Sequence, residues 1–374
     1  MTDPDGAIAW VAVAVLGVLA GWALVAALPR LLAEAGDAAG PTPATIGRWV
    51  LLAAPLAAVA LWWWESVARG QLPSAAIEPA TVGGARFAGH VVFFTLLTAA
   101  SWIDMRQRVI PDAVTAPGVF AGLAWSAVVP AALLPIAVEV PRSFAQPELV
   151  PDVLGLCGGL RAALPPWWLE PRPSLPGLAV ALAVFLCWWW FCTAASDMAP
   201  PLRQPRHLLL IAGVAGVVVA WWCGGMPWRG LLTGLAGLAV GAAMIWLTRV
   251  GASRALGREA MGFGDVTLMA MVGSWLGWQA AVIVALLAVF IGLAHGTVQL
   301  MRHRESELPF GPSLCLASVL TVVAWRPLWD RTAAAFDQPL EIGAVVATII
   351  ALTAVSLTAW RRMRDIPADQ TPSE

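Results

Sequence analysis

Long apolar segments alternate along the chain with short polar segments that contain arginine. Eleven apolar segments are candidates for crossing a bilayer, which takes about 20 residues, or fewer inside a bundle. They are residues 7–28, 49–64, 87–103, 113–135, 177–195, 207–223, 228–248, 265–278, 279–299, 309–326 and 340–360. This pattern predicts an all-α fold, a polytopic transmembrane helix bundle of about 11 spans.

The arginines are divided unequally between the two sides of this predicted bundle. Every second polar segment, counted from 29–48, together with the tail from residue 361, carries 14 of the 22 Arg, and the other side carries 8 over longer segments. Cytoplasmic loops are enriched in positive charge. We therefore expect an inner-membrane protein with its N-terminus outside and its C-terminus in the cytoplasm. Asp104 and Asp265 then both lie at the cytoplasmic side.

The composition agrees with a membrane protein. Hydrophobic residues make up 59% of the chain and charged residues 12%, whereas a soluble domain has roughly 25% charged residues. A net charge of −1 argues against a nucleic-acid partner. The five cysteines form no C-x-x-C pair and lie apart from any cluster of metal ligands, so we expect neither a metal nor a cofactor.

Asp104 stands where an apolar segment ends. Arg106 and Arg108 follow it, and then come Pro111, which ends any preceding helix, and Asp112, which can cap the next one. On this segment alone, an interfacial aspartate paired with arginine is the favoured interpretation of Asp104.

Asp265 precedes another apolar segment, and Gly262 and Gly264 stand just before it. An aspartate at a helix start is ordinarily an N-cap, but that interpretation leaves the two glycines unexplained. Glycine permits positive φ and the close approach of another chain.

Two carboxyl groups at membrane depth are costly and usually functional. When they lie a few ångströms apart they cannot both ionise easily, so they share a proton. The ionised group can then accept a proton from water while the protonated group polarises a carbonyl. This chemistry hydrolyses a peptide bond without a nucleophilic side chain or a metal.

Three ordered motifs resemble those of the type IV prepilin peptidases, which are membrane aspartyl proteases. They are Asp104 with Ile110-Pro111-Asp112, the Gly-x-Gly-Asp segment at 262–265, and Leu308-Pro309-Phe310-Gly311-Pro312. The resemblance covers roughly residues 87–135 and 228–326. It implies that Asp104 and Asp265 are the catalytic pair and that Gly262 and Gly264 shape the loop at Asp265. It also implies supporting roles for Asp112, Pro309 and Gly311.

The chain departs from this family in several places. Bifunctional members carry paired C-x-x-C motifs between their first two helices, whereas residues 29–48 contain no Cys, so we expect no N-methyltransferase activity. Thr267 stands where many members have lysine. We divide the chain into five segments: 1–86, N-terminal helices and an external loop; 87–135, first-aspartate helices; 136–227, an inserted external loop and two extra helices; 228–326, peptidase helices; and 327–374, an extra C-terminal helix and tail.

The resemblance implies an aspartic endopeptidase that cleaves the leader of type IV pilin-like precursors at the cytoplasmic face. Its expected partners are the prepilin-like substrate and the lipid bilayer; the oligomeric state stays open. Two alternatives remain. A proton- or ion-coupled transporter would use the same acids as a relay, and an inactive scaffold would keep the fold alone.

Overall fold

The computed structural model describes most of the chain. The described residues are 4–34, 44–72, 80–140, 142–147, 175–195, 206–257, 259–303, 309–336, 343–348, 351–352, 355 and 358. All structural statements below concern these residues.

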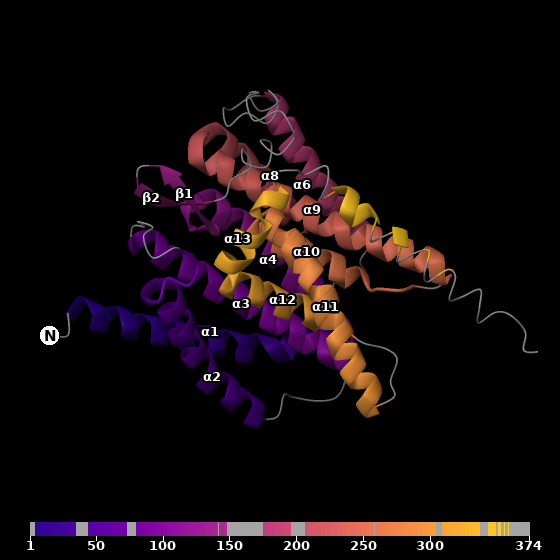
Figure 1. Cartoon of the computed structure of the whole chain (residues 1–374), viewed down its shortest axis with the longest axis horizontal. Helices are drawn as coiled ribbons and strands as arrows, with labels where there is room; N and C mark the ends of the chain where they lie inside the picture. The colour runs from indigo at the N-terminus through magenta and orange to yellow at the C-terminus, as the bar shows by residue number, and fades with distance from the viewer. Residues whose placement is uncertain are drawn as a thin grey trace, which may run out of the picture.

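The described chain is a bundle of helices with one small β-ribbon (Figure 1). The helices of the first half are α1 (Pro4–Glu34), α2 (Ala44–Trp62), the π-helix η1 (Trp63–Val67), α3 (Ala80–Gln107), α4 (Asp112–Val128) and the short 3-10 helix η2 (Pro130–Ala132). Those of the second half are α6 (Leu175–Ala195), α8 (Arg206–Cys223), α9 (Gly225–Leu256), α10 (Phe263–Leu276), α11 (Trp278–His303), α12 (Gly311–Val323) and α13 (Trp325–Phe336).

The predicted helical membrane bundle is confirmed. Six described helices are long and apolar enough to cross a membrane, or seven if the bent pair of α12 and α13 counts as one span. Two further apolar helices, α8 and α10, are shorter. Each of the first ten predicted spans coincides with a described helix. The eleventh, 340–360, lies partly outside the described residues.

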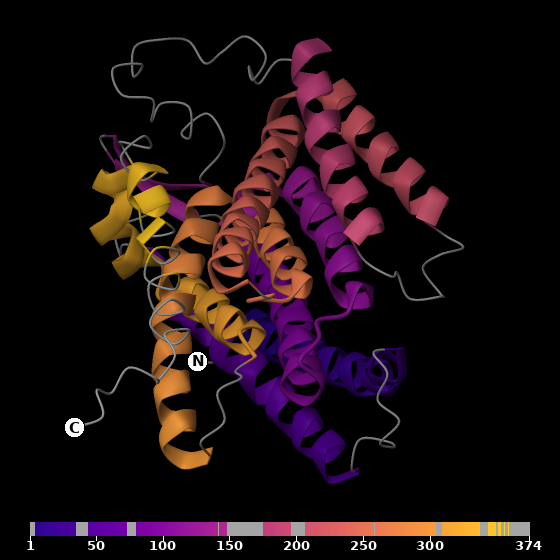
Figure 2. The same cartoon turned by 90° about the vertical axis from the view of Figure 1, so that its right-hand side faces the viewer.

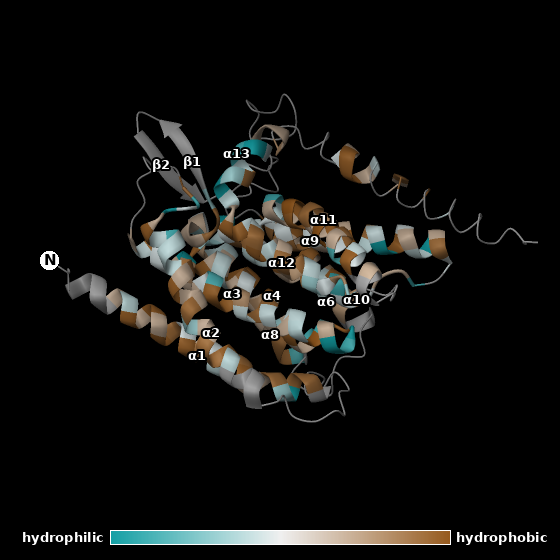
Figure 3. Ribbon diagram, turned by 60° about the horizontal axis from the view of Figure 1, so that its bottom comes forward, coloured by the Kyte–Doolittle hydropathy of each residue, from teal (hydrophilic) through white to brown (hydrophobic). Residues whose placement is uncertain are grey.

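The outer helices consist largely of hydrophobic residues (Figure 3), and many of their large apolar side chains are exposed. The C-terminal half of α11 extends beyond its neighbours (Figure 2), and Phe290 and Leu293 on it are each 69% exposed. Leu56 on α2 is 70% exposed. Apolar surface of this extent is stable in a lipid bilayer and unfavourable in water.

Helix α10 is the centre of the bundle because α4, α9, α11 and α12 all pack against it. All its residues from Asp265 onward are buried. The contact with α9 is a backbone contact at Gly237 and Gly273, since a Cβ on either glycine would lie 2.0 Å from the carbonyl oxygen of the other. Small residues at membrane helix contacts allow this approach. The predicted division between α10 and α11 is confirmed at Gly277, which has φ +82°.

Two predicted spans extend too far. The span 113–135 ends as a helix at Val128, and the chain continues through η2 into β1 (Pro135–Val140), which pairs antiparallel with β2 (Arg142–Pro147). Pro130 and Pro135 interrupt helical hydrogen bonding there. The span 309–326 breaks after α12, where α13 turns away by 93°. Most of the predicted external loop that follows lies outside the described residues.

A buried polar cluster lies near the N-terminal half of α3. His90 Nδ1 lies 2.6 Å from Glu65 Oε1, and Gln71 Nε2 donates to the same oxygen at 3.2 Å. Gln71 Nε2 also donates to the Val322 carbonyl oxygen at 3.0 Å, which ties the cluster to α12. The π-helix places Glu65, near the end of its span, inside the bundle. His90 is a buried, hydrogen-bonded histidine.

We predict that Glu65→Leu lowers the free energy of unfolding by about 1–3 kcal/mol, because His90 and Gln71 would lose a buried acceptor. Glu65→Gln keeps an amide oxygen at the same place and should lose much less. Thermal unfolding of both variants in detergent measures the difference. Equal stability of the two variants would contradict the assigned hydrogen bonds.

Candidate active site

Three chain segments meet around the two aspartates. Asp104 lies in the last turn of α3, and Asp265 lies in the first turn of α10. The N-terminus of α12, at Gly311, contacts the Asp104 carboxyl group. Both acids are buried, with Asp104 5% and Asp265 7% exposed. A buried carboxyl group is costly unless it is paired, hydrogen-bonded or protonated.

The structure brings Asp104 and Asp265 into one site. Asp104 lies within electrostatic range of Asp265, and Cys315 on α12 lies within range of both. Asp104 makes no ion pair with Arg106 or Arg108 among the described residues. The interpretation of Asp104 as an aspartate paired with arginine therefore fails here, and so does that of Asp265 as an N-cap, because Gly262 is the N-cap of α10.

Gly264 allows the two aspartate loops to touch. A Cβ on Gly264 would lie 2.9 Å from Ile110 Cβ and 3.1 Å from the Ile110 carbonyl oxygen, on the loop that follows Asp104. Its φ is not positive, so close approach rather than backbone conformation explains the glycine. Gly262 differs, because a Cβ there would meet only the Gly264 backbone nitrogen, at 4.0 Å.

Gly311 gives the third motif a structural explanation. A Cβ on Gly311 would lie 2.4 Å from Asp104 Oδ2, so only glycine lets α12 begin against this carboxyl group. The Gly311 backbone N–H donates a hydrogen bond to the Asp104 carboxyl, and the N-terminus of a helix favours negative charge. Pro309 precedes α12 and is partly buried. The Asp104 Oδ2 atom is buried without a hydrogen-bond partner among the described residues.

Asp112 takes a different position from the one expected. Pro111 is the N-cap of α4 and Asp112 is its first residue, so Asp112 is not the cap. A carboxylate in the first turn still interacts favourably with the helix dipole. Asp112 lies within electrostatic range of Cys192 on α6.

Thr267 links the Asp265 segment to α4. Its hydroxyl donates to the Gly264 carbonyl oxygen at 3.0 Å and accepts from the Thr115 hydroxyl at 3.2 Å. Both threonines are buried. The position where many prepilin peptidases have lysine is therefore filled here by a neutral hydrogen bond between helices.

Sequence reasoning missed Arg249, which holds the loop before α10. Its Nε donates to the Met261 carbonyl oxygen at 2.8 Å, and its Nη2 pairs with Glu259. Its guanidinium also lies over the Phe263 ring, 5.9 Å from the centroid. These three contacts could not be predicted from an arginine in a membrane-boundary loop, because they depend on how the loop folds back on α9.

Comparison with known proteins supports the resemblance. Residues 178–297 match the Type IV leader peptidase family. The chain is 32% identical over 152 residues to the prepilin leader peptidase/N-methyltransferase of Aeromonas salmonicida (strain A449), which covers 40% of this chain and 50% of that protein. It is 34% identical over 154 residues to the protein of that name from Burkholderia pseudomallei (strain 1026b), covering 40% and 48%. No solved structure matches the chain.

The fold and the paired acids define a polytopic helical membrane protein with a buried aspartate site. Residues 178–297 are similar to the Type IV leader peptidase family, and the relatives that the chain matches are named as prepilin leader peptidase/N-methyltransferases. It spans about half the length of the curated relatives that it matches. The family match contains Asp265 but neither Asp104 nor Gly311.

Proposed function

We propose that this protein is an aspartic endopeptidase in which Asp104 and Asp265 cleave the leader of a type IV pilin-like precursor. The observation that carries the proposal is the common site of the two acids, which come from helix ends far apart in the sequence. Similarity to the Type IV leader peptidase family and to relatives named as prepilin leader peptidases supports the substrate class.

The proposed mechanism needs one proton shared between the two carboxyl groups. The ionised carboxylate accepts a proton from a water molecule, and the water oxygen attacks the scissile carbonyl carbon. The protonated carboxyl donates a hydrogen bond to the carbonyl oxygen, where negative charge develops. The tetrahedral intermediate then collapses: the peptide C–N bond breaks and the leaving nitrogen takes a proton from the pair. The carboxyl groups thereby return to their starting state.

Asp104 is suited to this role because its Oδ2 is buried without a partner among the described residues. The Gly311 N–H donates a hydrogen bond to the same carboxyl group and holds it in place. The arginine distribution supports a cytoplasmic position for the site, in an inner-membrane protein with its N-terminus outside and its C-terminus inside. A short basic leader in the cytoplasm, followed by an apolar helix along the bundle, fits this orientation.

We further propose that the protein does not methylate the cleaved product, although its matched relatives are named as peptidase/N-methyltransferases. Residues 29–48 contain no cysteine, whereas bifunctional members carry paired C-x-x-C motifs between their first two helices. Incubation with radiolabelled S-adenosylmethionine and a cleaved pilin-like peptide tests this. Transfer of label to the peptide N-terminus would contradict the proposal.

The transporter alternative requires polar groups along a path through the bundle. Between His90 and Asp104, a distance of about 21 Å along α3 at 1.5 Å per residue, the buried side chains of α3 are apolar. They include Phe93, Leu97 and Ile103, each 1% exposed or less. Along α3, therefore, no buried polar side chain joins His90 to Asp104, as a relay through this helix would need.

The proposed function is tested by incubating the purified full-length protein in detergent with a prepilin-like substrate. We expect one cut between the leader and the apolar helix, identified by the masses of both products. An inactive scaffold predicts no product from the wild-type protein, and that result would overturn the proposed function.

The two loop glycines provide a matched comparison. We expect Gly264→Ala to lower the cleavage rate at least about tenfold, because its methyl group would press on Ile110 and separate the aspartate loops. Gly262→Ala meets open space and should retain the wild-type rate. Initial rates at saturating substrate measure both variants. The explanation of Gly264 is wrong if the two variants lose activity equally.

A further inference from the structure

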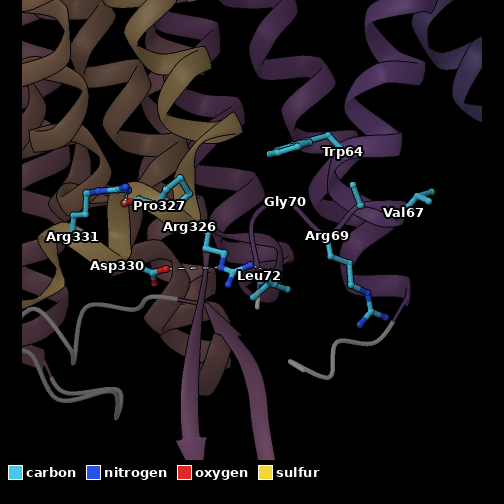
Figure 4. Close-up of a pocket in the computed structure, with 10 residues that line it drawn as sticks. Trp64, Val67, Arg69, Gly70, Leu72, Arg326, Pro327, Asp330 and Arg331 are labelled. Carbon is cyan, nitrogen blue, oxygen red and sulfur yellow. Dashed lines mark hydrogen bonds and ion pairs between the residues drawn. The ribbon is translucent and has the colours of Figure 1, made fainter. Parts of the chain in front are cut away.

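A pocket opens at the end of the bundle that lies far from the two aspartates. Its volume is about 890 Å³, and it lies between the segment that follows α2 and the first turns of α13 (Figure 4). Its charged residues are Arg69, Arg326, Asp330 and Arg331, and Trp64 forms part of its wall. We refer to these five residues as the arginine pocket.

Helix α12 fixes the position of this pocket relative to the acids. Its N-terminus at Gly311 contacts Asp104, whereas the carbonyl oxygen of Val323, at its C-terminus, accepts a hydrogen bond from Trp64 Nε1 at 2.8 Å. The 13 residues of α12 span about 20 Å at 1.5 Å per residue. The arginine pocket therefore lies outside the proposed peptidase site, at the other end of α12.

The pocket has an excess of positive charge, with three arginines and one acid among its lining residues. Arg326 Nε lies 3.8 Å from Asp330 Oδ2, a long ion pair in which the two side chains are 45% and 62% exposed. Arg326 Nη1 also donates to the Leu72 carbonyl oxygen at 3.4 Å. Arg331 Nη1 donates to the Pro327 carbonyl oxygen at 2.6 Å.

These contacts use few of the available donors. A guanidinium has five N–H groups, and among the described residues Arg331 uses one of them. Figure 4 shows Arg326 and Arg331 on one wall and Arg69 on the other. Guanidinium groups bind phosphate oxygens in a bidentate manner, and they do so more specifically than ammonium groups.

The surroundings of the pocket match the boundary of a bilayer. Helix α13 turns by 93° from the apolar α12, and it is amphipathic, with Trp325 and Phe336 buried and Arg326, Asp330 and Arg331 exposed. Such a helix lies along a membrane surface. Trp64 lies in η1, directly after the apolar α2, and tryptophan is common at lipid headgroup level. Headgroup phosphates are the anions at that level.

We propose that the arginine pocket binds a phosphate group, presented by the headgroup of an acidic phospholipid. The fit rests on the bidentate donors of Arg326 and Arg331, the positive balance of the lining and the position at the bundle end. It is independent of the peptidase proposal, because it involves neither aspartate.

The test uses the full-length protein in a non-ionic detergent and measures binding by thermophoresis. The ligands are short-chain phosphatidylglycerol, short-chain phosphatidylcholine and inorganic phosphate. We expect phosphatidylglycerol to bind most tightly, with an affinity that falls as salt is added.

Arg331→Gln should weaken binding of phosphatidylglycerol about tenfold. Arg254→Gln, which removes an exposed arginine of α9 outside the pocket, should leave it unchanged. Asp330→Asn should strengthen binding, because it removes the acid from the pocket.

Each outcome decides the proposal. Equal binding of phosphatidylglycerol and phosphatidylcholine overturns it, as does equal behaviour of Arg331→Gln and Arg254→Gln. If inorganic phosphate binds as tightly as phosphatidylglycerol and Arg331→Gln weakens both, the phosphate site stands and the lipid is rejected as its source. Thermal unfolding of each variant without ligand identifies losses that come from misfolding.

Discussion

Asp265→Asn and Asp104→Asn should each lower the rate of leader cleavage by about 10²–10⁴-fold, the range that a positioned acid or base contributes. Asparagine has nearly the shape of aspartate but cannot accept or release the shared proton. Because both carboxyl groups are buried, the substitution also removes a costly group, so we expect wild-type or higher thermal stability. Single-turnover cleavage and thermal unfolding measure the two effects separately.

The double variant provides the control for this prediction. If the two acids act as one unit, Asp104→Asn combined with Asp265→Asn is no slower than either single variant. Additive losses would mean that the acids contribute independently. Wild-type activity in either single variant would contradict the role of that aspartate in the proposed mechanism.

Gly273→Ala should destabilise the protein by about 1–3 kcal/mol or more, the cost of forcing extra atoms into a packed contact. The added methyl group would lie 2.0 Å from the Gly237 carbonyl oxygen, and neither partner has a side chain that could move aside. Helices α9 and α10 would have to separate. Since α10 carries Asp265, the cleavage rate should fall as well. Chemical unfolding in mixed micelles measures the stability change.

Gly216→Ala in α8 provides the matched control because it makes the same chemical change in open space. There the methyl group meets no atom within 4 Å, so the lower helix-forming tendency of glycine dominates. We expect this variant to be more stable by about 0.5–1 kcal/mol. The backbone contact between α9 and α10 is not supported if both alanine variants change stability in the same direction.

The helices were predictable because apolar runs of sufficient length leave few alternatives in a membrane. The division at Gly277 was also visible in the sequence, since glycine there permits φ +82°. The β-ribbon after α4 was not predicted because the residues between α4 and residue 135 are as apolar as the helix itself. Only the geometry of Pro130 and Pro135 ends the helix.

The site was only partly predictable. The motif around Asp265 identified the acid and the two glycines before it. The structure explains these two glycines differently. Gly264 is required by the approach of Ile110, and nothing in the described structure requires Gly262 to be glycine. The contact of Gly311 with Asp104 joins distant segments, so no local pattern contains it. The partnership of Glu65 with His90 was hidden for the same reason.

The most direct test of the account is the proximity of the two acidic positions. In a variant lacking native cysteines, Asp104→Cys and Asp265→Cys are introduced together and treated with a short bifunctional thiol reagent. The account predicts efficient intramolecular cross-linking of this pair and none for Asp104→Cys with Arg331→Cys, which lie at opposite ends of the bundle. If both pairs react alike, or if the two cysteines are labelled from opposite sides of the membrane, a shared aspartate site is contradicted.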